Sequence, residues 1–463
     1  MKKQTSNRIV LVNAISVGLQ SGISMLLVPV YSRLLGTDNY GLVSIYTTWL
    51  SILSVIIGLR SFYAVGIASK DFPENEQLMF QATGVYIGVA TSIISIVLIT
   101  LLLKPLSNLL KLPEWSVLLL GFHAFGVFSI QMLNWKFTYE FKPVKNLLVS
   151  TSMSLGTALI SIVLILLLPM EQRYLGKSLG TAVPPIICGI SLLVFCIKKR
   201  AFFNKIHLKY MLAYTMPLVF SDLCTTLFSG SDKLMLQWMK TNSEVGIYSL
   251  AFNFAGLLFS IEYMLNHSWQ PLYFQYKATG NNQELYLHMR RYIRLFSILT
   301  IGFLLLSPEV FQVFAAPEFL NGKNLIPIFS IGCYFYFMEV LAINYKSFHR
   351  ESKTVAVIAV ISSLANLFLN TLLIPHFGVV GASVATAIGY LLGLICNWMT
   401  LKYANMEDKT YTYELKVLFH YLIFVFIAAV LFYLPQTIII RWTSGILLGI
   451  WLLKNILKEK QIF

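Results

Sequence analysis

The stretch YTMPLVFSDLCTTLFSGSDKLMLQWMKTNSEVGIYSLA, residues 214–251, decides the architecture. It contains an apolar span with one aspartate, Asp222, in its interior, and the span ends at Asp232 and Lys233. A short polar turn comes next, and a second apolar span begins at residue 245. The stretch lies at the midpoint of the chain, and the C-terminal half beyond it repeats features of the N-terminal half.

The composition identifies a membrane protein. Of the 463 residues, 57% are hydrophobic and only 12% are charged, whereas soluble domains carry about 25% charged residues. Apolar runs of roughly 20 residues, the length that crosses a ~30 Å hydrocarbon core, recur along the chain. We therefore predict an all-α polytopic membrane protein with about fourteen transmembrane helices. They are expected at residues 10–31, 41–63, 81–103, 115–135, 144–168, 174–197, 211–230, 246–265, 293–314, 325–345, 355–374, 379–401, 417–434 and 437–453. Twelve is the alternative, because Arg441 interrupts the start of the last span.

The basic residues predict the orientation. Most of the 35 Lys and Arg fall in segments that are cytoplasmic if the N-terminus is inside, which is the asymmetry that the positive-inside rule describes. We therefore expect both termini in the cytoplasm. Contacts between cytoplasmic Lys and Arg and anionic lipid headgroups explain the net charge of +15, so no nucleic-acid partner is expected.

Neither catalytic residues nor a cofactor site is predicted. The five cysteines fall within predicted spans and form no metal-ligand spacing with histidine. The sequence carries no phosphate-binding P-loop motif, and its predicted loops are short. We therefore expect a protein that is not an enzyme and that needs no metal or cofactor.

Matching motifs in the two halves predict an internal repeat. Gly41 before the second span matches Gly246 before the eighth, and Gly176 matches Gly381 at the same offset along the chain. Small residues at this spacing also allow close helix packing, which is the alternative explanation. We predict two parallel six-helix repeats that form two lobes around a central cavity. The predicted divisions are residues 1–200, residues 201–404 and an additional two-helix tail at residues 405–463.

Polar and ionisable side chains inside the spans are the candidate functional residues, because leaving such groups in lipid is costly. Several share a helical face, such as Glu339 with Lys346. The candidates for lining a substrate path are Arg60, Asp222, Glu262, Glu339, Lys346 and Asn366. Arg33, Asp232 and Lys233 are candidates for a gate at the outer end or for ordinary helix-end pairs. The alternative for the first group is hydrogen bonding between packed helices or anchoring at the membrane interface.

Three motifs together resemble the polysaccharide exporter family, which comprises the O-antigen and repeat-unit flippases of the multidrug/oligosaccharidyl-lipid/polysaccharide superfamily. The motifs are Arg33-Leu34-Leu35-Gly36 with Tyr40-Gly41, Met216-Pro217 through Leu236 continued by Val245 to Ala251, and Asn370 to Ala387. The similarity covers roughly residues 8–400. The two-helix tail departs from the common twelve-helix form of this family.

The resemblance implies a flippase that moves an undecaprenyl-diphosphate-linked oligosaccharide to the outer leaflet by alternating access. Such a protein would serve O-antigen, lipopolysaccharide, capsule or exopolysaccharide assembly in the bacterial cytoplasmic (inner) membrane. The implied partners are this lipid-linked oligosaccharide, the bilayer, a polysaccharide polymerase and a chain-length regulator. Arg60 and Lys346, which we place near the cytoplasmic ends of their spans, would hold the diphosphate, the arginine in a bidentate manner.

Two other functions remain open. A cation-coupled multidrug antiporter of the same superfamily would carry an acidic, aromatic pocket within one lobe. A non-transporting membrane scaffold for a polysaccharide polymerase would not need spans whose polar faces point toward one another. The mixture of cations and acids in the spans favours the flippase.

Overall fold

The computed structural model describes residues 3–404, 410–434 and 437–459, and these residues form helices joined by short turns, with no strand among them. Ten helical segments within these ranges are long and apolar enough to cross a membrane. Two of them, Met25–Ala68 and Ser352–Leu401, contain 44 and 50 residues. Both are about twice as long as the roughly 20 residues that one crossing of the hydrocarbon core needs. The all-helical polytopic class is confirmed, and the count of fourteen stays a prediction.

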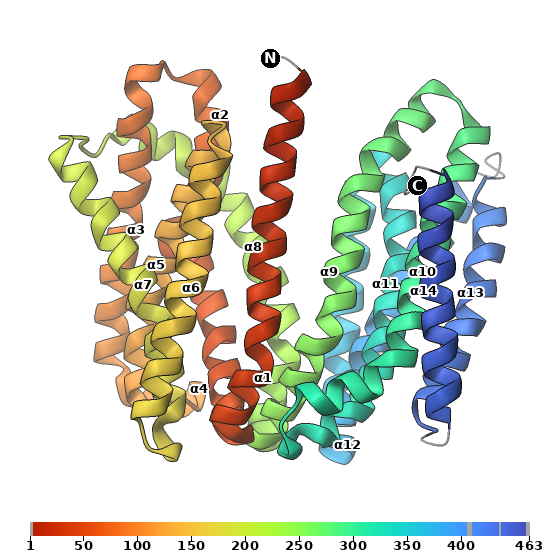
Figure 1. Cartoon of the computed structure of the whole chain (residues 1–463). Coiled ribbons are helices and arrows are strands. Elements are labelled where there is room, and N and C mark those ends of the chain that lie inside the picture. Colours follow the sequence, from red (N-terminus) through yellow and green to blue (C-terminus); the bar gives the residue numbers. More distant parts are fainter. Residues whose placement is uncertain (1–2, 405–409, 435–436, 460–463) are drawn as a thin grey trace. The chain divides into compact units, whose positions relative to one another are not determined.

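A glycine divides each of these two long helices. α1 (Lys3–Ile56) runs to Gly36, whose φ of 68° and ψ of 174° break the helix, and then turns back along itself (Figure 1). α12 (Ser352–Ala404) is interrupted in the same way at Gly378, with a φ of 53°. A positive φ has little steric cost only for glycine, so the residue type determines where each hairpin turns. The two arms of α12 therefore correspond to the predicted spans 355–374 and 379–401. The arms of α1 correspond to the predicted spans 10–31 and 41–63, of which the second extends beyond Ile56.

The residues up to Gly246 form the first compact unit, called unit 1. Within it, α8 packs against α1 and η1, α6 against α1 and α7, and α5 against α3 and α7. After α1, the elements are η1 (Ile57–Tyr63), α2 (Ala64–Asp71), η2 (Glu74–Glu76), α3 (Gln77–Leu101), α4 (Leu103–Leu110), α5 (Glu114–Tyr139), α6 (Pro143–Leu167), η3 (Met170–Gln172), α7 (Arg173–Lys198), α8 (Lys205–Met239) and the start of α9 (Asn242–Thr279). Unit 1 thus includes α8, although the predicted repeat boundary at residue 200, which stays a prediction, lies before it.

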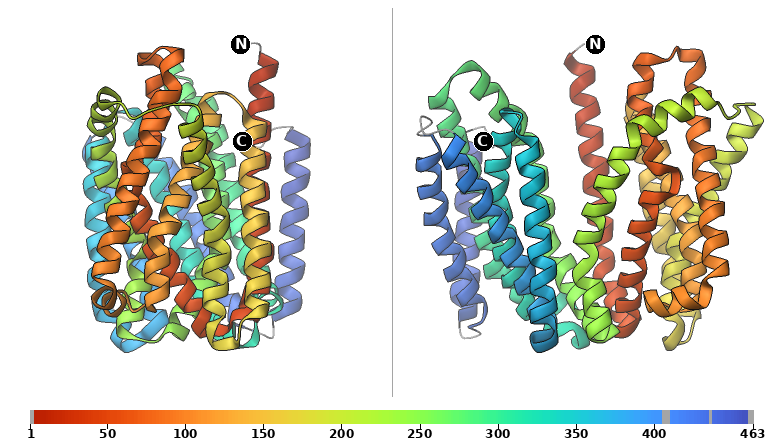
Figure 2. Two further views of the ribbon diagram at one scale, coloured as in Figure 1. Left: turned by 90° about the vertical axis from the view of Figure 1, so that its left-hand side faces the viewer. Right: turned by 180° about the vertical axis from the view of Figure 1, so that it is seen from behind.

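The residues from Ile247 onward form the second compact unit, called unit 2. After α9 it contains α10 (Asn282–Phe314), η4 (Pro317–Leu325), α11 (Ile326–Phe348), α12, α13 (Thr410–Phe432) and α14 (Ile438–Glu459). α11 packs along α12, and α10 packs against both α13 and α14. Figure 2 shows the last two helices, in blue, on one side of this unit. The predicted two-helix tail is therefore an integral part of unit 2.

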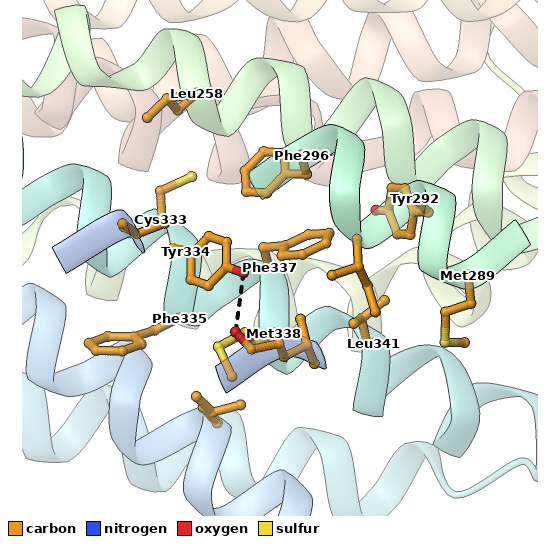
Figure 3. Packing of buried hydrophobic residues seen from close by; sticks show 14 of the residues in the cluster. Leu258, Met289, Tyr292, Phe296, Cys333, Tyr334, Phe335, Phe337, Met338 and Leu341 are labelled. Atoms are coloured by element: carbon orange, nitrogen blue, oxygen red, sulfur yellow. Dashed lines mark hydrogen bonds between the residues drawn. The ribbon is translucent and has the colours of Figure 1, made fainter. Parts of the chain in front are cut away.

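Aromatic side chains fill the core of unit 2 (Figure 3). The rings of Phe296 on α10 and Phe337 on α11 lie with their centroids 4.3 Å apart. The buried hydroxyl of Tyr334 is hydrogen-bonded to Ser297 at 2.9 Å and donates to the main-chain carbonyl of Leu418 at 3.5 Å. This core joins α10, α11 and α13, and it keeps its central hydroxyl hydrogen-bonded.

The repeated glycine motifs contact each other reciprocally within unit 1. Gly41 lies against the main-chain carbonyl of Asn242, and Gly246 lies against the main-chain carbonyl of Thr37. A Cβ atom on either glycine would stand 3.1 Å from the amide nitrogen of the other. Thr37 and Asn242 are separated by the same offset as the two glycines, so equivalent positions of the repeat make equivalent contacts. The repeat found in the sequence therefore corresponds to a symmetrical packing of backbone on backbone, which only glycine permits.

Candidate functional site

A strained backbone positions Arg60 in unit 1. Gly58, Leu59 and Arg60 follow one another in the left-handed region, with φ values of 73°, 47° and 53°. For a residue with a side chain this conformation costs roughly 1–2 kcal/mol. The amide of Gly58 donates instead to the hydroxyl of Thr91 on α3, at 2.9 Å. The regular main-chain hydrogen bonding of the helix is thus interrupted at η1, and this interruption directs the Arg60 side chain toward α8 and α5.

Arg60 forms an ion pair with an aspartate that lies far from it in the sequence of unit 1. Its Nε atom lies 2.9 Å from Oδ2 of Asp222 on α8, and Nη1 donates to Gln131 on α5 at 3.4 Å. The hydroxyl of Tyr63 donates to the same Asp222 oxygen at 3.3 Å. The guanidinium also lies 5.5 Å from the ring centroid of Phe62, a favourable arrangement for a cation. Two candidate residues that are remote in sequence are therefore ion-paired.

Unit 2 contains a second charged cluster, between α11 and α12. The ammonium group of Lys346 donates to Asn397 Oδ1 at 2.8 Å and to the hydroxyl of Thr400 at 2.6 Å. The amide nitrogen of Asn397 donates to Glu339 Oε1 at 2.9 Å. Lys346 is completely buried and Glu339 is 8% exposed. Asn397 therefore links a buried base to a buried acid, and all three side chains are satisfied together.

The carboxylate of Glu339 has room because α12 has a glycine beside it. A Cβ atom on Gly393 would stand 2.6 Å from Glu339 Oε1 and 2.8 Å from Oε2. Any larger residue at this position would push the carboxylate away from Asn397. Gly393, one turn before Asn397, is therefore part of the site.

Glu262 on α9 is buried separately in unit 2. The residue is 1% exposed, and its Oε1 atom has no hydrogen-bond partner among the described residues. Its neighbours Ile261 and Leu265 on α9 pack against the aromatic core. One turn further along α9, Asn266 accepts from Asn344 of α11 at 2.8 Å, and Gln270 donates to Asn344 at 3.0 Å. α9 thus presents a polar face to α11.

The other candidates lie apart from these clusters. Asn366 accepts a hydrogen bond from Asn370 at 3.2 Å and lies next to Gly389, so it joins the two arms of α12. Arg33 is exposed near the α1 turn, and Asp232 is buried on α8 beside Lys233. The substrate-path and gate roles of all nine residues stay predictions.

Sequence reasoning missed three polar partners. Asn397 and Thr400 look like ordinary polar residues of a span, although their spacing of three would place them on one face. Arg441 looks like an interruption of the last span. In the structure it is 2% exposed and its Nη2 atom pairs with Glu309 Oε1 at 2.5 Å, so its charge is matched inside unit 2.

The family follows from comparison with known sequences. Residues 7–277, more than half of the chain, match the family model described as polysaccharide biosynthesis protein. The chain belongs to the polysaccharide biosynthesis protein family. Residues 271–453 match a second model, described as lipid II flippase MurJ. The expected resemblance to polysaccharide exporters is thereby confirmed.

Individual relatives of this family member are distant in sequence. It is 23% identical over 228 residues to a probable low-salt glycan biosynthesis flippase, Agl15, of Haloferax volcanii, an alignment covering 48% of each chain. An uncharacterized membrane protein of Haemophilus influenzae is 21% identical over 377 residues, covering 78% of this chain and 90% of that one. The chain spans about half the length of Agl15 and about a third of a Methanocaldococcus jannaschii membrane protein that it also matches.

Solved structures share the fold of this polysaccharide biosynthesis protein. The lipid II flippase MurJ in an inward closed conformation superimposes with a TM-score of 0.73 at 14% identity, covering 97% of this chain and 99% of that chain. An inward-facing multidrug resistance MATE family transporter of the MOP superfamily gives a TM-score of 0.61 at 11% identity, covering 84% and 97%. The fold is thus common to flippases and to drug transporters.

Proposed function

We propose that this protein moves an undecaprenyl-diphosphate-linked oligosaccharide from the cytoplasmic to the outer leaflet by alternating access. It would do so in the bacterial inner membrane, with both termini in the cytoplasm, for surface polysaccharide assembly. A polysaccharide polymerase and a chain-length regulator are proposed partners. The family membership and the glycan flippase among the relatives support this proposal.

One observation carries the proposal: each compact unit holds oppositely charged side chains inside otherwise apolar helices. Arg60 with Asp222 in unit 1, and Lys346 with Glu339 in unit 2, are the two cases. Charged residues in a hydrocarbon environment are retained mainly where they serve a polar path or a bound ion. A glycan carrier needs such a path, because stripping one sugar hydroxyl of its hydrogen bonds costs about 1–3 kcal/mol.

A liposome assay tests the proposal directly. Purified protein is reconstituted with an undecaprenyl-diphosphate oligosaccharide that carries a fluorophore on its sugar, and a membrane-impermeant quencher reports which leaflet the sugar occupies. We expect the protein to accelerate loss of fluorescence from the inner leaflet, and Arg60→Ala to abolish that acceleration at equal incorporation. Unaccelerated quenching with well-folded wild-type protein would refute the proposal.

The second candidate, a cation-coupled multidrug antiporter, is favoured by a different observation. Glu262 and Glu339 are two buried acids on the adjacent helices α9 and α11, and a buried acid that gains and loses a proton can exchange it for a cationic drug. This candidate predicts resistance to cationic dyes in a drug-sensitive host, which Glu262→Gln would remove. Resistance without glycan transport would favour this function over the flippase.

A further inference from the structure

The guanidinium of Arg60 is incompletely satisfied by its surroundings. It carries five N–H donors, yet among the described residues its one side-chain hydrogen bond is the long contact to Gln131, at 3.4 Å. Nε lies 2.9 Å from Asp222 but makes no aligned hydrogen bond there. The Arg60 side chain is only 12% exposed, so water replaces few of the missing partners. Arg60 is therefore neutralised in charge but not saturated in hydrogen bonds.

Asp222 is the more accessible member of the pair. Its side chain is 30% exposed, and the contacts that hold it are the Arg60 approach and the Tyr63 hydroxyl at 3.3 Å. Asp222 belongs to α8, whereas Arg60 and Tyr63 belong to η1. A partly exposed carboxylate held by one ion contact and one long hydrogen bond can be exchanged for another anion at modest cost, provided that the new anion neutralises Arg60 in its place.

We propose that Asp222 is a built-in counter-anion, which occupies Arg60 until a diphosphate group displaces it. This inference rests on the proposed function, which supplies a diphosphate as the cargo headgroup. A phosphate presents several oxygens and can accept two parallel hydrogen bonds from the guanidinium fork, which Asp222 does not achieve. The ligand chemistry is that of a diphosphate ester or diphosphate ion.

The exchange explains why a carboxylate stands where an anionic cargo must bind. A nearly buried arginine without any anion is unfavourable, so the unloaded protein needs a counter-charge. The same carboxylate competes with the cargo and weakens its binding. Because Asp222 returns when the cargo leaves, release does not expose an uncompensated charge. Asp222 thus lowers the affinity for the diphosphate cargo and speeds its release. It also excludes weakly charged lipids, because these cannot displace it from Arg60.

Calorimetric titration of the purified, full-length protein in detergent tests the exchange. Undecaprenyl diphosphate and inorganic diphosphate serve as two separate probes, which distinguish a lipid-borne from a free source of the same group. We expect Asp222→Asn to bind the lipid roughly three- to tenfold more tightly than wild type, because a competing partly exposed charge is removed. Tighter binding should be accompanied by slower flipping in the liposome assay, since release becomes limiting.

Two controls isolate the Arg60 contact. Asp71→Asn removes one carboxylate from the same unit, and Asp71 pairs with Tyr210 rather than with an arginine, so its affinity should match wild type. In an Arg60→Gln background, Asp222→Asn should no longer tighten binding, because Asp222 and the diphosphate then no longer compete for the guanidinium. Asp222→Ser repeats the measurement if the asparagine variant folds poorly.

The outcomes separate this inference from the function on which it rests. If wild type binds undecaprenyl diphosphate and Asp222→Asn binds it equally or more weakly, the counter-anion role is overturned and the flippase function stands. Equal tightening in the Arg60→Gln background would also overturn it, since the effect would then be a general change of charge. If neither wild type nor any variant binds or flips the lipid, the proposed function itself fails.

Discussion

At the scale of single residues, Asn397 is the side chain that links the two buried charges of unit 2. Its side-chain oxygen accepts from Lys346 and its side-chain nitrogen donates to Glu339, so one amide satisfies a buried cation and a buried anion at once. Removing one partner from a buried ionic group is far more costly than removing the whole group. The cluster should therefore respond very unequally to different substitutions.

Asn397→Ala is expected to destabilise the protein by about 2–4 kcal/mol, because both charges lose a partner while remaining buried. Thr400→Val should cost less, since Lys346 keeps its bond to Asn397. The double variant Glu339→Gln with Lys346→Met should be more stable than Lys346→Met alone, because no unmatched charge remains. Thermal unfolding of the purified variants measures this order. A double variant less stable than the single one would contradict it.

At the scale of elements, the fold depends on two kinds of special position: glycines where backbones touch, and one charged pair that fixes the last helix. Arg441 of α14 donates to Glu309 of α10, and the neighbouring Trp442 donates to the same carboxylate at 3.1 Å. Glu309 thus accepts hydrogen bonds from two consecutive residues of α14. This arrangement attaches α14 to α10 at its first turn.

Arg441→Leu is expected to lower the unfolding free energy by roughly 2 kcal/mol, because it leaves the partly buried carboxylate of Glu309 without its cation. Adding Glu309→Gln should recover part of the loss, since the uncompensated charge disappears. The matched control is Arg294→Leu: the Arg294 guanidinium lies 5.5 Å from the ring centroid of Trp451 and should matter less. Equal losses in both variants, measured by denaturant unfolding, would show that α14 is not held by its charge pair.

Gly246→Ala and Gly41→Ala are expected to reduce the yield of folded protein sharply, because a Cβ atom at either position overlaps a main-chain carbonyl. A backbone atom cannot move aside as a side chain can. Gly256→Ala on the same helix, α9, is the control, since no atom lies within 4 Å of the added carbon. Monodisperse yield after membrane extraction is the readout, and unaffected yield in both variants would exclude a close-packed contact.

The helices can largely be predicted from the sequence, and their partners cannot. Hydropathy reports how well a segment suits lipid, so it locates the spans and the hairpin turns. It carries no information about which remote residue neutralises a charge. Asp222 and Arg60 are both candidates by sequence, but nothing in the sequence pairs them. Arg441 looks like a defect in a span because its compensating Glu309 lies on another helix, far away along the chain.

At the scale of the whole molecule, the distribution of basic residues predicts the orientation. We expect a reporter that is active only in the cytoplasm to function when fused after Phe463, because the positive-inside rule places that end there. As the matched control, the same reporter is inserted in the turn between α6 and α7, around Glu171, which should be external. Activity of an exported reporter at Phe463 would reverse the predicted orientation.

The reciprocal contact of Gly41 and Gly246 has a consequence for how such a chain can have arisen and can diverge. Gly41 touches Asn242, and Gly246 touches Thr37, which is the position equivalent to Asn242 in the first repeat. Two identical copies that pair through the same surface make contacts of this self-complementary kind. In a shorter ancestor that paired with itself, one mutation would have altered both sides of this contact together. In the fused chain the two sides are encoded separately. Each side can therefore change alone, and a larger residue on one side would break the contact even if the other side kept its glycine.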